Sequence, residues 1–402
     1  MNYFNSPAKD KSNHRLFKYS RRIRSIDMLR GLVMILMALD HTREFFSSAN
    51  FNPADLALTT PGLFFTRWIT HICAPVFVFL AGTSAYLYGM RAGSKKELSN
   101  YLLTRGLLLI VLEFTIVKWG WQFSLHYSVL WVQVIWVLGV SMIVLAWLIN
   151  LPVKRIMIFG IAMILLHNLV DGINAEDFGS LKWLWLLIHQ KGTVSVAGKG
   201  LFQVVYPLVP WVGVMAVGYG FGETFLKEAH ERKKYLLQIG LAISILFLVV
   251  RGINIYGDPH PWSQQKNLTF TIMSFLNCEK YPPSLSFMLM TLGPAITLLG
   301  VFEGVRGWKK KFLLPFGRTP LFFYLIHIPL IHLLSVLFTS KPALDSTFIY
   351  RGYEHTALPT GYGFDLPVIY LMWIIVVLGL YPLSKWYAEL KSQRKYKWLS
   401  YL

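Results

Sequence analysis

The sequence predicts an all-α, polytopic integral membrane protein with about ten transmembrane helices and with both termini in the cytoplasm. Three observations support this fold class. Of the 402 residues, 54% are hydrophobic and 15% are charged, and the mean hydropathy is +0.47, values typical of a chain whose main solvent is lipid. The apolar residues form runs that can cross a bilayer, which takes about 20 residues per helix. The basic residues lie in short clusters between those runs.

Ten apolar runs follow one another along the chain. Each is predicted to be a helix, because inside lipid a helix satisfies its own backbone polar groups. In order, the predicted helices are 26–46, 64–89, 101–118, 128–150, 153–170, 200–222, 235–253, 286–304, 312–338 and 366–384. Two further apolar stretches, 183–188 and 268–276, are too short to span and are predicted as interfacial or re-entrant pieces.

The basic residues are divided unevenly between the two sets of connecting segments. With a cytoplasmic amino terminus, the inside segments contain 25 arginines and lysines and the outside segments contain seven. This asymmetry predicts the orientation, and it explains most of the formal net charge of +19 without a nucleic-acid partner. We divide the chain into a basic cytoplasmic head at 1–25, one transmembrane domain at 26–385 and a basic cytoplasmic tail at 386–402. We expect no cleaved signal peptide; the head is interpreted as a positively charged anchor, with anionic lipid binding as an alternative.

The first predicted helix carries ionisable residues that are costly at membrane depth and are therefore functional candidates. Arg30 and His41 are 11 residues apart, which places them within about 20° of one face and about 16 Å apart along the axis. Asp40, next to His41, is predicted to orient the imidazole as a general base. The alternatives are snorkelling of Arg30 beside Asp27 and a structural interhelix hydrogen bond from His41.

The second predicted helix places His71 at a depth similar to that of His41, so His71 is the second candidate for a catalytic histidine. A plain packing role is its alternative. The small residues 81–85 on the same helix are predicted to form a helix contact face.

The ninth predicted helix contains Arg318, Tyr324, His327 and His332. The two histidines are five residues apart, too far round a helix to share a face, so no metal site is expected. Interhelix hydrogen bonding is the alternative for both. Arg318, like Arg30, is predicted to meet an anionic group arriving from the cytoplasm, with helix capping as its alternative.

Further polar and aromatic residues lie where cavities or interfaces are expected. Broken, aromatic-rich helix entries in a membrane are tolerated where they line a cavity, and their rings can stack on sugars, although interfacial anchoring explains Trp and Tyr equally well. The residues predicted to bind a substrate are Tyr206, Trp211, Lys280, Tyr281 and His332. Arg105, Glu113 and Arg251 are further candidates, for which a structural role is as well supported as a functional one.

Several of these runs resemble one known family. They are RIRSIDMLRG from Arg22 to Gly31, MALDH up to His41, APVFVFLAG from Ala74 to Gly82, YPLVPWVG from Tyr206 to Gly213 and KYPPS from Lys280 to Ser284. Together they are similar to the catalytic-domain family of heparan-alpha-glucosaminide N-acetyltransferase, in its bacterial type. That family lies within a wider group of membrane acyltransferases whose first helix carries an arginine, ten residues and then a histidine, a spacing that Arg30 and His41 match.

The resemblance implies that a cytosolic acyl-CoA donates an acyl group to a sugar across the membrane, with a histidine as base. The lysosomal relative has its catalytic histidine after the first core helix, whereas residues 47–66 here contain no histidine. His41 is therefore placed first and His71 second. Acetyl-CoA is the expected donor and no metal is expected.

The resulting hypothesis is an acetyl-CoA-dependent acyltransferase in the bacterial cytoplasmic (inner) membrane, acting on an extracytoplasmic glycan or glycolipid. Arg30 and Arg318 would bind the donor, and membrane lipids are expected partners; a homo-oligomer is left open. The first alternative is a transporter or flippase for an anionic or lipid-linked substrate. A membrane scaffold or sensor with buried polar contacts is the second.

Overall fold

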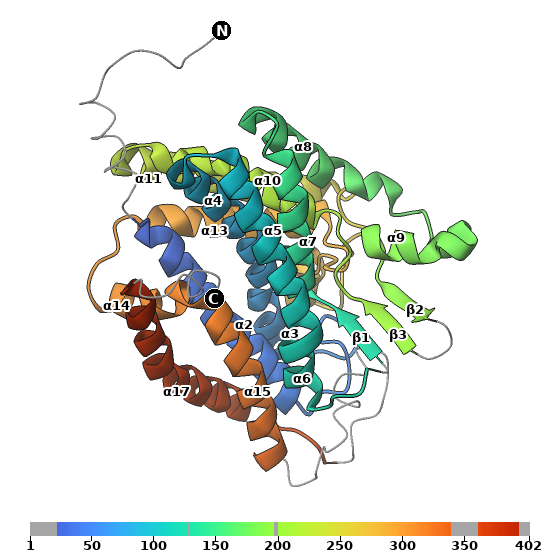
Figure 1. Cartoon of the computed structure of the whole chain (residues 1–402). Coiled ribbons are helices and arrows are strands. Elements are labelled where there is room, and N and C mark those ends of the chain that lie inside the picture. The colour runs from blue at the N-terminus through green and yellow to red at the C-terminus, as the bar shows by residue number, and fades with distance from the viewer. Residues whose placement is uncertain (1–21, 128, 197–199, 339–360, 394–402) are drawn as a thin grey trace, which may run out of the picture.

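The computed structural model describes residues 22–127, 129–196, 200–338 and 361–393, and these parts form a helical membrane bundle (Figure 1). Its helices are α2 (Arg24–Phe46), α3 (Pro61–Ile69), α4 (Cys73–Ala92), α5 (Lys95–Leu112), α6 (Lys118–Gln122), α7 (Val134–Leu148), α8 (Val153–Leu166), α9 (Lys182–Ile188), α10 (Trp211–Phe221), α11 (Ala229–Ile253), α12 (Leu268–Leu276), α13 (Leu285–Phe302), α14 (Trp308–Arg318), α15 (Pro320–Phe338) and α17 (Leu366–Ser392). The all-α prediction is confirmed, and each of the ten predicted spans contains a helix.

Seven helical segments within the described residues are long and apolar enough to cross a membrane. Helices of three predicted spans are not among these seven. Helix α2 has too many charged residues, and α7 and α10 are too short, with 15 and 11 residues. The predicted count of ten spans stays a prediction. So does the side on which the termini lie; residues 1–21 of the predicted head and 394–402 of the predicted tail lie outside the described residues.

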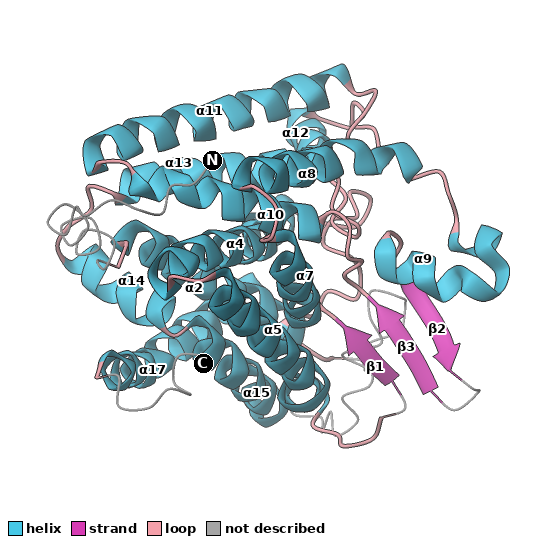
Figure 2. Ribbon diagram, turned by 45° about the horizontal axis from the view of Figure 1, so that its top comes forward, coloured by secondary structure: helices cyan, strands magenta, loops and turns pink. Residues whose placement is uncertain are grey.

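Two predicted helices begin later than expected, because their first residues are strands. Strands β1 (Val129–Val132), β2 (Gly192–Val196) and β3 (Gly200–Val204) form one sheet in the order β1-β3-β2, with β1 parallel and β2 antiparallel to β3. Figure 2 shows this sheet beside α9 at the edge of the bundle. Valine and aromatic residues favour strands when a pairing partner is present. The apolar run alone did not reveal that partner, which comes from a distant part of the sequence.

The ninth predicted helix, 312–338, is broken into α14 and α15 between Arg318 and Pro320. Thr319, which ends α14, has a non-helical backbone with φ −128° and ψ 44°. A proline at a helix start needs no amide hydrogen bond, and it disfavours the helical conformation of the residue before it. The two short apolar stretches, 183–188 and 268–276, are the helices α9 and α12; their interfacial or re-entrant placement stays a prediction.

Helix α2 lies in the middle of the described bundle and packs against α4, α13, α14, α15 and α17 (Figure 1). Its closest contact is with α14. A Cβ atom added to Gly31 would lie 2.1 Å from the Leu313 carbonyl oxygen, and one added to Gly317 would lie 1.7 Å from the Asp27 carbonyl oxygen. The two backbones therefore touch, which sets the position of the first half of α2.

The predicted contact face of α4 is confirmed at Gly82. A Cβ atom there would meet the Met215 carbonyl oxygen of α10 at 2.1 Å. Thr83 adds a hydrogen bond from its hydroxyl to the Gly218 carbonyl oxygen at 2.9 Å. Small residues thus allow α4 and α10 to pack backbone to backbone.

Candidate functional site

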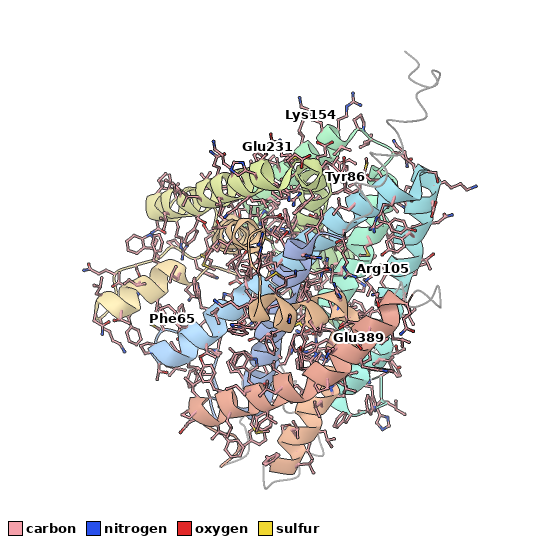
Figure 3. All side chains as sticks on the ribbon, turned by 90° about the vertical axis from the view of Figure 1, so that its left-hand side faces the viewer. Phe65, Tyr86, Arg105, Lys154, Glu231 and Glu389 are labelled. Atoms are coloured by element: carbon pink, nitrogen blue, oxygen red, sulfur yellow. The ribbon has the colours of Figure 1, made fainter. Side chains whose placement is uncertain are left out.

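A cavity of about 1280 Å³ opens at the end of the bundle where α2 begins. It is strongly cationic: eleven arginine and lysine residues and four carboxylates line it. The cations are Arg22, Arg24, Arg30, Arg91, Arg105, Lys227, Arg232, Arg306, Lys310, Arg318 and Lys391, and the acids are Asp27, Glu97, Glu228 and Glu303. Figure 3 shows this side of the molecule, with Arg105 on α5 and Glu389 near the end of α17. Such a lining is suited to a polyanionic ligand.

Arg30 projects into this cavity and is held by three groups. Its guanidinium donates to the Ser84 hydroxyl at 2.9 Å, to the Gly317 carbonyl oxygen at 3.3 Å and to Asp27 at 3.4 Å. The Asp27 carboxylate also accepts a hydrogen bond from Arg22 at 2.5 Å. One carboxylate is therefore shared by two guanidinium groups, which leaves positive charge at this wall of the cavity.

Arg318 lines the same cavity, so the structure brings the two predicted donor-binding arginines together. Its Nε atom is buried and has no hydrogen-bond partner among the described residues. Arg318 is the last residue of α14 and precedes the break at Thr319. A guanidinium placed in this way can bind an anion that enters the cavity.

On α2 the cavity lining continues through Met34 to Met37, one helical turn before His41. The His41 ring contacts Trp121 of α6 edge-on at 4.8 Å between centroids and His327 of α15 at 5.2 Å. Its side chain is 14% exposed. His41 therefore lies just beyond the inner end of the cavity and stays accessible.

The carboxylate beside His41 is Glu44, and the prediction that Asp40 orients this ring is wrong. His41 Nδ1 lies 3.4 Å from Glu44 Oε2. Asp40 instead pairs with two arginines: Arg67 donates to one of its oxygens, and Arg43 donates to the other at 3.1 Å. Consecutive side chains on a helix diverge by about 100°, whereas residues three apart share a face.

Asp40 and Arg67 belong to a second polar cluster, on another face of α2, which includes most of the predicted acceptor-binding residues. Lys280 lies 5.1 Å from the centre of the Tyr281 ring. The Tyr281 ring is in turn 5.2 Å from that of Tyr206, and Tyr206 is 5.6 Å from Trp211. These aromatic groups are largely buried, with Trp211 at 0% exposure.

His71 is buried and its Nδ1 has no hydrogen-bond partner among the described residues. Its ring lies 5.3 Å from that of Phe287 on α13. The charged side chains near it are those of Arg67, Lys280, Asp40 and Arg43. His71 therefore lies against the second polar cluster and apart from the His41 and His327 pair.

His332 does not reach the aromatic cluster of Tyr206 and Tyr281. Its ring is stacked between Phe45 and Phe123, with centroid distances of 4.8 and 3.9 Å, and its Nδ1 donates to the Gly120 carbonyl oxygen at 3.0 Å. These contacts match the interhelix hydrogen-bonding alternative.

His327 lies beside His41 in the candidate site, where the sequence did not place it. It is fully buried, and its Nδ1 lies 2.9 Å from the Phe323 carbonyl oxygen. A carbonyl oxygen accepts only, so Nδ1 carries the hydrogen and Nε2 keeps its lone pair. Nε2 has no partner among the described residues. The sequence signal is the spacing from Tyr324, since residues three apart share a helix face.

The remaining polar candidates have mainly structural contacts. Glu113 is buried in a π-helical turn, Glu113–Val117, and accepts a hydrogen bond from the Trp136 amide in the first turn of α7 at 2.9 Å. Arg105, eight residues before Glu113 on the predicted third helix, lines the cavity, so these two candidates lie in different surroundings. Arg251 donates to the carbonyl oxygens of 260, 274, 275 and 277 at 2.9–3.2 Å and organises the segment after α11.

Outside the spans, His260 and Glu279 form an ion pair with 3.3 Å between Nε2 and Oε2. The hydrogen bond that His260 donates to the Glu279 carboxylate raises the pKa of His260. Burial acts to raise the pKa of Glu279, but the bond to His260 and a backbone amide outweigh it and the pKa is lowered. Among the described residues, no group of three His, Cys, Asp or Glu side chains is arranged to bind a metal ion.

Comparison with known protein families yields one match, over residues 22–256. This region includes α2, the cavity-lining residues Ser84 and Arg105, and the aromatic residues Tyr206 and Trp211 of the second polar cluster. A search among curated proteins found no match. The matched model, described as heparan-alpha-glucosaminide N-acetyltransferase, catalytic, covers more than half of the chain. The chain therefore belongs to this family of membrane acetyltransferases.

Proposed function

We propose that this protein transfers an acetyl group from cytosolic acetyl-CoA to a sugar or glycolipid on the extracytoplasmic side of a bacterial cytoplasmic membrane. The observation that carries the proposal is the stripe of α2 residues that leads from the cationic cavity to His41. Arg30, Met34 and Met37 line the cavity in successive turns, and His41 is next on the same face.

The cavity suits the donor by charge and by shape. Coenzyme A carries a diphosphate and a separate phosphate on a nucleotide, and arginine is the preferred partner of such groups. Arg30 and Arg318 would bind these phosphates. The long pantetheine arm would then extend along α2 toward His41, which lies about 16 Å from Arg30 along the helix axis.

His41 would act as the general base. With Nδ1 turned toward Glu44, its Nε2 would take the proton from the attacking hydroxyl or amine, as the acceptor oxygen or nitrogen forms its bond to the thioester carbon. His327 carries a second bare imidazole nitrogen beside it. A histidine at this position can later return the proton to the thiolate of coenzyme A.

The sugar of the acceptor would bind at the second polar cluster, beside Asp40, and its reacting hydroxyl or amine would extend round α2 to the neighbouring His41. Tyr206, Trp211 and Tyr281 offer rings on which a sugar can stack, and Lys280 and Arg67 lie beside them. Asp40 connects this cluster to α2 through Arg67.

The test is acetyl transfer from radiolabelled acetyl-CoA in membranes that contain the protein. Wild type should label a glycan or glycolipid, and His41→Ala should reduce the rate at least about 100-fold, the usual contribution of a general base. His230→Ala is the matched control, because His230 is exposed at the start of α11. Full activity of His41→Ala would remove the proposed base. Substrate flux in proteoliposomes without acetyl-CoA, together with no labelling, would support a transporter instead.

The acceptor can be found separately. Mass spectrometry of envelope glycans from cells with and without the protein should show one acetyl group lost at a defined sugar. Identical spectra would contradict an envelope glycan as the acceptor.

A further inference from the structure

The inner end of the cavity is formed in part by Tyr324, one turn into α15. Its side chain is 4% exposed overall, yet it belongs to the cavity lining together with Arg318, Pro320 and Leu321. Its ring lies 5.6 Å from that of His327, which in turn is 5.2 Å from His41. Tyr324 thus both lines the cavity and contacts His327, the neighbour of His41.

The Tyr324 hydroxyl has a hydrogen that it can donate to a ligand. The hydroxyl has no acceptor at hydrogen-bonding distance among the described residues. Its polar neighbours are the carboxylates of Glu113 and Glu44, which lie beyond hydrogen-bonding distance, and the indole of Trp121, which itself contacts His41. An indole N–H donates and cannot accept, so this neighbour does not use the phenolic hydrogen. A buried donor without an acceptor is costly, and a ligand oxygen would satisfy it.

We infer that Tyr324 is a catalytic residue which donates a hydrogen bond to the carbonyl oxygen of the bound thioester. This inference rests on the proposed function, since it names the group that stabilises the charge formed in that reaction. The acceptor lone pair attacks the carbonyl carbon, and the carbonyl electron pair moves onto oxygen. Collapse of this intermediate restores the carbonyl, breaks the carbon–sulfur bond and releases the thiolate of coenzyme A.

Throughout these steps Tyr324 keeps its proton and donates a hydrogen bond to the oxyanion, while His41 takes the proton of the acceptor. The two roles need different positions. His41 must face the acceptor, and Tyr324 must face the donor in the cavity, as the lining places it. A donor already directed at the position where charge develops is the usual origin of such stabilisation.

The first test is Tyr324→Phe, which removes the hydroxyl alone. Loss of one such donor lowers kcat about 100- to 1000-fold, and we expect the Kd for coenzyme A itself to be unchanged. Tyr387→Phe is the matched control: Tyr387 is also buried, its hydroxyl has no partner among the described residues, and it lies on α17 away from the cavity lining. It should keep wild-type kcat.

The second test measures binding and needs no turnover. A ketone analogue of acetyl-CoA keeps the carbonyl, whereas S-ethyl-CoA lacks it. Wild type should bind the ketone several-fold more tightly, and Tyr324→Phe should lose that preference while binding S-ethyl-CoA normally, which also shows that the variant is folded.

An unchanged preference, or an unchanged kcat, would overturn the role of Tyr324. If wild type binds no coenzyme A and labels no acceptor, the proposed function itself fails. The two failures are therefore distinguishable.

Discussion

His41 and Glu44 form a histidine–carboxylate pair on one face of α2, with 3.4 Å between Nδ1 and Oε2. Glu44 also lies 3.6 Å from Arg43. The His41–Glu44 contact is an ion-pair distance, since His41 Nδ1 has no hydrogen-bond partner among the described residues. A carboxylate on this side of the ring favours the tautomer with the hydrogen on Nδ1, which leaves Nε2 free to accept a proton.

The pair predicts that Glu44→Gln lowers the acetyl-transfer rate about 10-fold or more, because the amide orients the ring less strongly and does not stabilise the imidazolium. The measurement is kcat for acetyl transfer in wild type and in Glu44→Gln under the same conditions. Glu231→Gln is the control, since Glu231 is exposed on α11 (Figure 3). Wild-type kcat in Glu44→Gln would show that the pair is not functional.

Gly31→Ala should destabilise the protein, because the new methyl group would lie 2.1 Å from the Leu313 carbonyl oxygen of α14. Overpacking of this kind costs about 1–3 kcal/mol and displaces neighbours. Thermal unfolding in detergent measures the effect. Gly379→Ala is the control, since a Cβ there has no heavy atom within 4 Å. Equal unfolding temperatures for the two variants would contradict the close contact of α2 and α14.

Arg251→Lys should loosen the segment between α11 and α13, although the charge is kept. Arg251 is 2% exposed and satisfies four carbonyl oxygens, a geometry that a single ammonium group cannot reproduce. We expect a loss of about 1–3 kcal/mol in unfolding free energy, as for buried groups left unsatisfied. Hydrogen exchange should become faster in α12. Exposed Arg155→Lys should change neither quantity.

The His260–Glu279 pair predicts a pH-dependent contribution to stability. The raised pKa of His260 gives stability that is present below its ordinary value near 6.5 and is lost as pH rises. The lowered pKa of Glu279 gives stability that is present above its ordinary value near 4.5 and is lost as pH falls. Since His260 is 73% exposed, the pair should contribute less than about 1 kcal/mol.

The check is the unfolding temperature of wild type relative to His260→Ala across this range. The difference should be largest between pH 4.5 and 6.5 and should shrink on both sides. A difference that grows above pH 7 would contradict the assigned direction.

The sequence predicted the helices because burial in lipid imposes long apolar runs, a requirement that is local in the chain. It did not predict β1 and β3, since Val129–Val132 and Gly200–Val204 depend on pairing between segments about 70 residues apart. The break at Thr319 was missed for a different reason: the apolar pattern continues across it, and only the proline at 320 marks it.

The sequence likewise predicted one part of the candidate site and missed another. The common stripe of Arg30 and His41 follows from helix geometry alone, and Arg318, predicted to bind the same donor as Arg30, lines the same cavity. The partner of Asp40 could not be predicted, because Arg67 comes from α3 and reaches Asp40 only through tertiary packing. The sequence did not place His327 in the site, because that placement depends on its contact with His41, which is far away in the sequence.

The backbone contact of α2 with α14 has a consequence for how a large donor enters. With Gly31 and Gly317 seated against opposing carbonyl groups, neither helix can slide or roll past the other without a collision. Arg30 and Arg318 are thus held at a fixed separation, so any widening of the cavity for a nucleotide would come from the other helices that line it, where α5 and α11 begin and α17 ends.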